Sequence, residues 1–140
     1  MVHPDAEVSR VGGDAVRLFM GFMGPYDQGG PWNPNGVTGC KRFLDKVWAL
    51  ANGKLSEIDP GVIEAKLLNK AIKKVGEDLE DFKFNTAIST LMVLTNELSS
   101  LDEPSKRSVE LLKVIQNYPP VTLNLFQGLT QKTDPEINSG

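Results

Sequence analysis

Apolar residues recur every three or four positions along four long segments of the chain, and this spacing constrains the fold more than any other feature. In segment 61–81 the row contains Ile63, Leu67, Leu68, Ala71, Val75 and Leu79. Such spacing places the apolar side chains on one face of an α-helix. The alternation typical of strands is nearly absent. The sequence therefore predicts an all-α protein, built as an antiparallel helical bundle with short connections.

Gly, Pro and Asn residues divide the chain into six expected helices. These cover residues 4–11, 15–22, 37–51, 61–81, 85–101 and 105 to just before Pro119. Asp14 is expected to cap the second helix by accepting from its free backbone N–H groups. Gly76 is expected to bend or divide the fourth. The apolar face of the fifth is expected to end with Leu101.

Composition excludes several classes of protein. The chain has 140 residues, a net charge of −3 and 40% hydrophobic residues, which suits one soluble domain and argues against coating nucleic acid by bulk charge. One Cys and one His leave no intramolecular disulfide and too few ligands for a structural zinc site. No apolar run reaches the length of a membrane span. A reduced, cytoplasmic setting is expected.

No catalytic constellation is recognisable in the residues themselves. His3 is the only possible histidine base and lies near a terminus, so it is interpreted as exposed. Cys40 is interpreted as a buried packing residue rather than a reactive thiol. The Gly-rich stretches 12–17 and 29–36 lack the spacing of a phosphate-binding loop and are interpreted as connections.

Charge is segregated along the chain. Residues 36–74 carry eight Lys or Arg against four acids, whereas residues 75–103 carry seven acids against one Lys. Lys66, Lys70, Lys73 and Lys74 fall on one side of the fourth helix, opposite its apolar row. Their mutual repulsion would be relieved by an anionic partner such as a phosphate backbone. On charge alone, an ordinary solubilising face is the preferred explanation of the pattern.

Several blocks of the sequence resemble leucine–tRNA ligase of the bacterial type, a class I aminoacyl-tRNA synthetase. They are "GGDAVRLFMGFMGP" at residues 12–25, Trp32 in the loop that follows, "GVTGCKRFLDKVW" at residues 36–48 and "LLNKAIKKVGEDLEDFKFNTAISTLM" at residues 67–92. The resemblance covers residues 2–115. It implies three regions: a hinge helix and connecting loop from the catalytic domain at 1–35, an anticodon-binding-type helical bundle at 36–117, and a disordered tail at 118–140.

The resemblance implies a part in protein biosynthesis, with leucine attached to tRNA(Leu) by the full enzyme using ATP. The ATP-site motif of the family would precede "VHPD" at residues 2–5, so this chain is expected to hold no cofactor, ATP site or leucine site and to be inactive alone. Its expected partner is the tRNA phosphate backbone. The residues expected to bind tRNA are Arg42, Lys46, Lys66, Lys70, Lys73 and Lys74. No catalytic residue and no metal ligand is expected.

Both tryptophans lie in the blocks that carry the resemblance, and each is expected to serve packing. Trp32 would hold the connecting loop, and Trp48 would fill the core between the third and fourth helices. After residue 115 the sequence "QNYPPVTLNLFQGL" does not follow the family pattern. Two alternatives therefore stay open: a stand-alone helical module that binds protein, including a separate catalytic chain, and a non-functional gene remnant.

Overall fold

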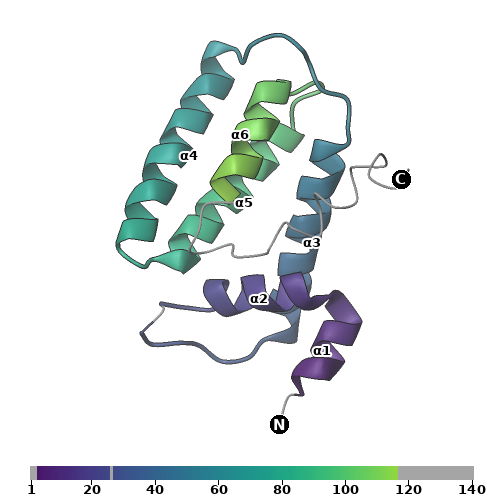
Figure 1. Ribbon diagram of the computed structural model, residues 1–140, viewed down its shortest axis with the longest axis vertical. Coiled ribbons are helices and arrows are strands. Elements are labelled where there is room, and N and C mark those ends of the chain that lie inside the picture. The colour runs from purple at the N-terminus through teal and green to yellow at the C-terminus, as the bar shows by residue number, and fades with distance from the viewer. Residues whose placement is uncertain (1–2, 26, 117–140) are drawn as a thin grey trace, which may run out of the picture.

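The structure, a computed structural model, describes residues 3–25 and 27–116, apart from the side chains of 114–116. Within these ranges it contains six helices and no strand: α1 (Pro4–Val11), α2 (Gly13–Phe22), α3 (Pro34–Ala51), α4 (Val62–Glu80), α5 (Phe84–Ser99) and α6 (Lys106–Gln116). In Figure 1, α3, α4, α5 and α6 run side by side, α2 crosses below them and α1 lies beyond α2. The predicted all-α bundle is confirmed. The division at residues 35 and 117 stays a prediction, and 118–140 lies outside the described residues.

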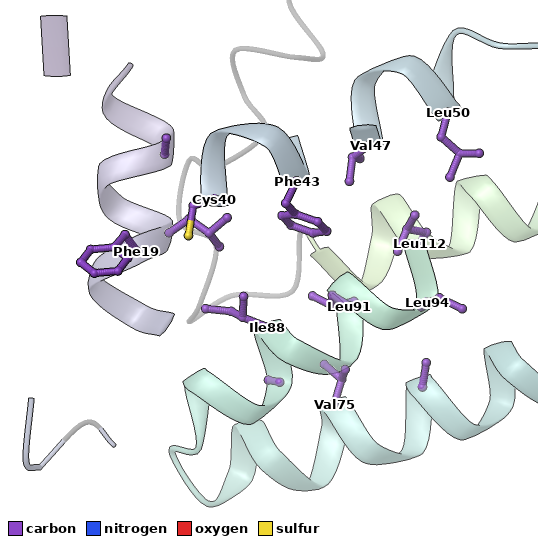
Figure 2. Packing of buried hydrophobic residues seen from close by; sticks show 14 of the residues in the cluster. Phe19, Cys40, Phe43, Val47, Leu50, Val75, Ile88, Leu91, Leu94 and Leu112 are labelled. Carbon is purple, nitrogen blue, oxygen red and sulfur yellow. The ribbon is translucent and has the colours of Figure 1, made fainter. Parts of the chain in front are cut away.

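A single apolar core joins all six helices. Figure 2 shows its centre, where Phe43 and Val47 of α3 face Ile88 and Leu91 of α5, with Leu112 of α6 beside them. These side chains are all buried. Burying a side chain of this size stabilises the fold by about 1.5–3 kcal/mol. α5 is the central element, because α2, α3, α4 and α6 all pack against it.

Aromatic packing fixes α2 against the start of α3. The rings of Phe19 and Trp32 meet edge to face, with centroids 5.2 Å apart. A Cβ atom added at Gly36 would lie 2.4 Å from Cε2 of Phe19, so only glycine fits beside the ring. Cys40 lies one turn further along α3 and is fully buried. We call Phe19, Trp32, Gly36 and Cys40 the α2–α3 seam; Trp32 holds the connecting loop as predicted.

Two helix starts differ from prediction. α3 begins at Pro34 instead of residue 37, because the Asn33 side chain accepts from the backbone N–H of Asn35 at 3.0 Å and Pro is favoured in a first helical turn. α2 begins at Gly13 with no side-chain cap. The predicted cap, Asp14, pairs instead with Arg17 one turn along the helix.

The burial of three apolar residues was predicted wrongly. Ile63 is 77% exposed, because it lies at the first turn of α4 on the side away from α5 and α6. Leu101 follows the end of α5 and is 40% exposed. Trp48 is only half-buried, and α3 packs chiefly on α2 and α5 instead of α4. α4 continues through Gly76 without interruption, so the predicted division there is also wrong.

A short backbone junction closes the connection around α4 and α5. Ser56 donates its backbone N–H to the Pro104 carbonyl at 3.0 Å, and Lys106 donates its own to the Ser56 carbonyl at 2.9 Å. The backbone N–H of Ser105 donates to the Glu64 carboxylate at 3.0 Å. The segment between these points is therefore a helical hairpin whose two ends meet at one place.

Candidate nucleic-acid interface

The four lysines predicted to bind an anion lie together on one exposed side of α4. Leu68, Ala71 and Val75 occupy the opposite side, and all three are buried. A helix turns by 3.6 residues, so positions 66, 70, 73 and 74 share a face while the apolar row faces α5 and α6. The structure therefore confirms the helical placement on which the prediction depended. It does not test whether these lysines bind tRNA.

Ion pairs distinguish the lysines from one another. Lys74 pairs with Asp78, a carboxylate that is almost fully buried. Lys73 approaches Glu77 only to 3.9 Å, and both side chains are largely exposed. Within the described ranges, Lys66 and Lys70 have no ion-pair partner. Lys66 and Lys70 are therefore the cations of this side that are most available to a ligand. Lys74 is the least available, because it is paired with Asp78.

The two predicted cations of α3 approach α5 from the other side. Nζ of Lys46 donates to Oδ1 of Asn96 on α5 at 2.7 Å. The amide nitrogen of Asn96 consequently keeps its two N–H donors for a ligand. Arg42 lies one turn before Lys46 and is exposed, so it occupies the same side of α3. Figure 1 shows α3 and α4 on opposite sides of α5.

Between these two rows of cations lies an uncovered surface, which we call the outer face of α5. It consists of the exposed residues Thr86, Ser89, Val93, Asn96 and Glu97 and the half-buried Thr90. On its α4 side the surface deepens into a groove of about 490 Å³, the α4–α5 groove. The groove has a mainly apolar lining and a charged rim formed by Lys70, Lys73, Lys74, Glu77 and Glu97.

Charge on this surface is positive but moderate. The rim of the α4–α5 groove carries three lysines against two glutamates. Lys66 precedes it on α4, while Arg42 and Lys46 lie beyond it on α3. The lysines and Arg42 outnumber the two glutamates, so the surface keeps the positive charge balance that a phosphate backbone requires.

The other two candidates from the sequence are Cys40 and His3. Burial raises the pKa of the Cys40 thiol from 9.0 to about 11, which makes it a poor nucleophile at neutral pH. His3 is exposed. No group of three or more His, Cys, Asp or Glu among the described residues could hold a metal ion. None of the described helices combines the length and apolar character needed to cross a bilayer.

Sequence analysis missed the contribution of α5 to this surface. α5 carries few charged residues, so the charge pattern of the sequence did not indicate Ser89, Thr90 and Asn96. A helical wheel of α5 would have grouped Ser89 with Asn96, since both lie opposite the apolar row. Their position beside the cations of α3 and α4 depends on tertiary packing.

Comparison with known proteins gives a consistent set of relatives. The chain is 43% identical over 137 residues to the leucine–tRNA ligase of Chlorobaculum tepidum, covering 92% of this chain and 17% of that protein. For the leucine–tRNA ligase of Porphyromonas gingivalis the values are 42% over 135 residues, 92% and 15%. The first match extends past residues 2–115, so the expectation that the pattern ends there was too narrow. No family model matches the chain.

A solved structure agrees in fold. It is the agnB2 LeuRS of Agrobacterium radiobacter K84, crystallised as a ternary complex with tRNA and LeuAMS. The TM-score is 0.66 at 26% identity, and the likeness covers 89% of this chain and 19% of that one. The chain spans about a sixth of the length of each of the two leucine–tRNA ligases in the preceding paragraph.

Proposed function

Since this chain corresponds to a segment of the leucine–tRNA ligase family, we propose that its helical bundle binds the phosphate backbone of tRNA. The observation that carries the proposal is the arrangement of cations on two sides of the outer face of α5. Arg42 and Lys46 flank it from α3, and Lys66, Lys70 and Lys73 flank it from α4. The presence of tRNA in the complex of the Agrobacterium relative supports the same partner.

The contacts we propose are to phosphates, and they carry no reading of the anticodon bases. Lysine ammonium groups on the exposed side of a helix reach a backbone more readily than base edges inside a duplex. Binding should therefore be strongly salt-dependent and nearly independent of anticodon sequence. With about four phosphates neutralised, log Kd should change with log salt concentration with a slope of about 3–4.

A binding titration of the full chain with a tRNA(Leu) transcript over a range of salt concentrations tests this proposal. The double variant Lys70→Gln/Lys73→Gln should weaken binding and lower the slope by about one to two. Lys41→Gln is the matched control, because Lys41 pairs with Asp45 at 2.8 Å, away from the outer face of α5. Absence of binding at low salt, or affinity that does not change with salt, would overturn the proposal.

In the attachment of leucine to tRNA, we propose that this chain contributes tRNA binding and does not itself activate leucine. Leucine attachment by the family requires ATP, and we recognise no ATP-binding motif among these residues. The chain alone should therefore give no leucine-dependent pyrophosphate exchange, whereas tRNA binding should persist. Pyrophosphate exchange by the purified chain would contradict this assignment. A cytoplasmic location accords with these roles and is part of the same proposal.

A second candidate partner is a polypeptide that carries the catalytic part of the enzyme. Three aliphatic side chains before and at the start of α4 favour it, because Ile58, Val62 and Ile63 are each more than 70% exposed. Exposed apolar groups gathered in one place are typical of protein contact surfaces. Co-expression with the Chlorobaculum tepidum ligase lacking its matched segment tests this candidate: co-purification lost in Ile58→Ser/Ile63→Ser would support it, and absence of co-purification would reject it.

A further inference from the structure

The hydroxyl groups beside the α4–α5 groove donate their hydrogens to nearby backbone carbonyl groups. Oγ of Ser89 donates to the Asn85 carbonyl at 2.8 Å, and Oγ1 of Thr90 donates to the Thr86 carbonyl at 3.0 Å. Oγ1 of Thr86 donates to the Lys83 carbonyl, also at 3.0 Å. A hydroxyl has one hydrogen and two lone pairs, so these three groups can offer a ligand only acceptor oxygens.

This restriction decides which part of a nucleic acid can lie over α5. A phosphate oxygen also only accepts, so it could bind Ser89 or Thr90 only if the hydroxyl gave up its hydrogen bond to its own helix. Phosphates belong instead at the ammonium groups of Lys70 and Lys73, and at the free amide N–H groups of Asn96. The strip between these donors requires a ligand group that carries its own hydrogen.

Resting on the function proposed above, we propose that the oxygens of Ser89 and Thr90 accept hydrogen bonds from ribose 2′-hydroxyl groups. The 2′-hydroxyl is the backbone donor that RNA has and DNA lacks, and an A-form helix displays it in its wide, shallow minor groove. Val93 lies between the polar groups and is 59% exposed, which offers an apolar contact to the ribose carbons. The outer face of α5 would thus distinguish RNA from a backbone of equal charge.

Two tRNA(Leu) transcripts test this inference, one unmodified and one made with 2′-fluoro nucleotides in place of all four ribonucleotides. The fluoro transcript keeps the charge and the A-form geometry but has no hydrogen to donate at the substituted positions. The full chain should bind the unmodified transcript about tenfold more tightly, which is the effect expected of two neutral hydrogen bonds. Equal affinity for the two transcripts would overturn the inference, whereas failure to bind either would overturn the proposed function.

The double variant Ser89→Ala/Thr90→Val separates the hydroxyls from the rest of the surface. It should bind the unmodified transcript as weakly as the fluoro transcript, with affinity for the fluoro transcript unchanged. Lys70→Gln/Lys73→Gln should instead weaken both transcripts by a similar factor, because the phosphates are the same in each. Persistence of the tenfold preference in the hydroxyl variant would refute the assignment of Ser89 and Thr90.

Discussion

The α2–α3 seam and the α4–α5 groove are built on opposite principles. At the seam, shape decides: Phe19 is 3% exposed and fits against Gly36 with no space for a methyl group. At the groove, chemistry decides: Lys70 and Ser89 are exposed and little packing constrains them. Substitutions at the seam should therefore change stability, whereas substitutions along the groove should change binding.

The largest effect that tests this contrast is expected at Phe19. Phe19→Ala removes a buried ring that packs against Trp32, and the cavity should lower the free energy of unfolding by about 3–5 kcal/mol. Val93→Ala, in the groove, should change it by less than about 0.5 kcal/mol. Urea denaturation followed by far-UV circular dichroism measures both losses. Similar losses in the two variants would show that the seam and the groove do not differ in packing.

The second effect concerns the thiol in the seam. The unfolded Cys40 thiol ionises near its ordinary pKa of 9.0, whereas the folded thiol holds its proton up to about 11. Between these values the unfolded state binds fewer protons, so stability falls as pH rises, by about 2–3 kcal/mol at pH 11. Cys40→Ala lacks this term, so the difference between the two unfolding profiles isolates it. Parallel profiles from pH 8 to 11 would show that the thiol ionises freely.

Glycine-to-alanine substitutions should have opposite signs in the two regions. At Gly36 the new methyl group meets the Phe19 ring, and overpacking should cost about 1–3 kcal/mol. At Gly76 on α4 nothing lies within 4 Å, so the better helix propensity of alanine should stabilise by up to about 1 kcal/mol. Gly39 gives a control within α3, because its surroundings are also open. Denaturation midpoints that shift in the same direction at Gly36 and Gly76 would contradict the comparison.

Two lysines of the α4–α5 groove should differ slightly in what they contribute to stability. Lys74→Gln leaves the buried Asp78 carboxylate without its charged partner and should cost about 1 kcal/mol, a modest value because Lys74 is half exposed. Lys70→Gln should be neutral for stability within about 0.5 kcal/mol. Thermal unfolding of the two variants compares them. A larger loss for Lys70 would mean that the groove is held together by the charges assigned here to ligand binding.

Periodicity in the sequence was sufficient to predict the helices and most of the core, because a buried face repeats every 3.6 residues. Periodicity failed where the burial of a side chain depends on which other helices pack against its own helix. Ile63 was counted with the apolar row of α4 but lies on the side of the helix that faces away from α5 and α6. Trp48 sits on α3, which packs on α2 and α5 and leaves it half-buried.

The candidate interface was predictable only in part for a similar reason. The lysines of α4 stand out as a run of charge within one helix. The pairing of Lys46 with Asn96 joins residues that are 50 positions apart, so no local pattern could indicate it. The acceptor character of Ser89 follows from a hydrogen bond to its own helix, which a list of residue types does not contain.

The junction at Ser56 and Ser105 makes the α4–α5 hairpin a continuous segment that begins and ends at one place. Backbone hydrogen bonds join its two ends at one place, so residues 57–104 could be exchanged between relatives provided that α5 keeps the buried face that packs on α2, α3 and α6. The surface presented to a ligand can then diversify by exchange of this unit. The aromatic packing between α2 and α3, formed elsewhere in the chain, would be inherited unchanged.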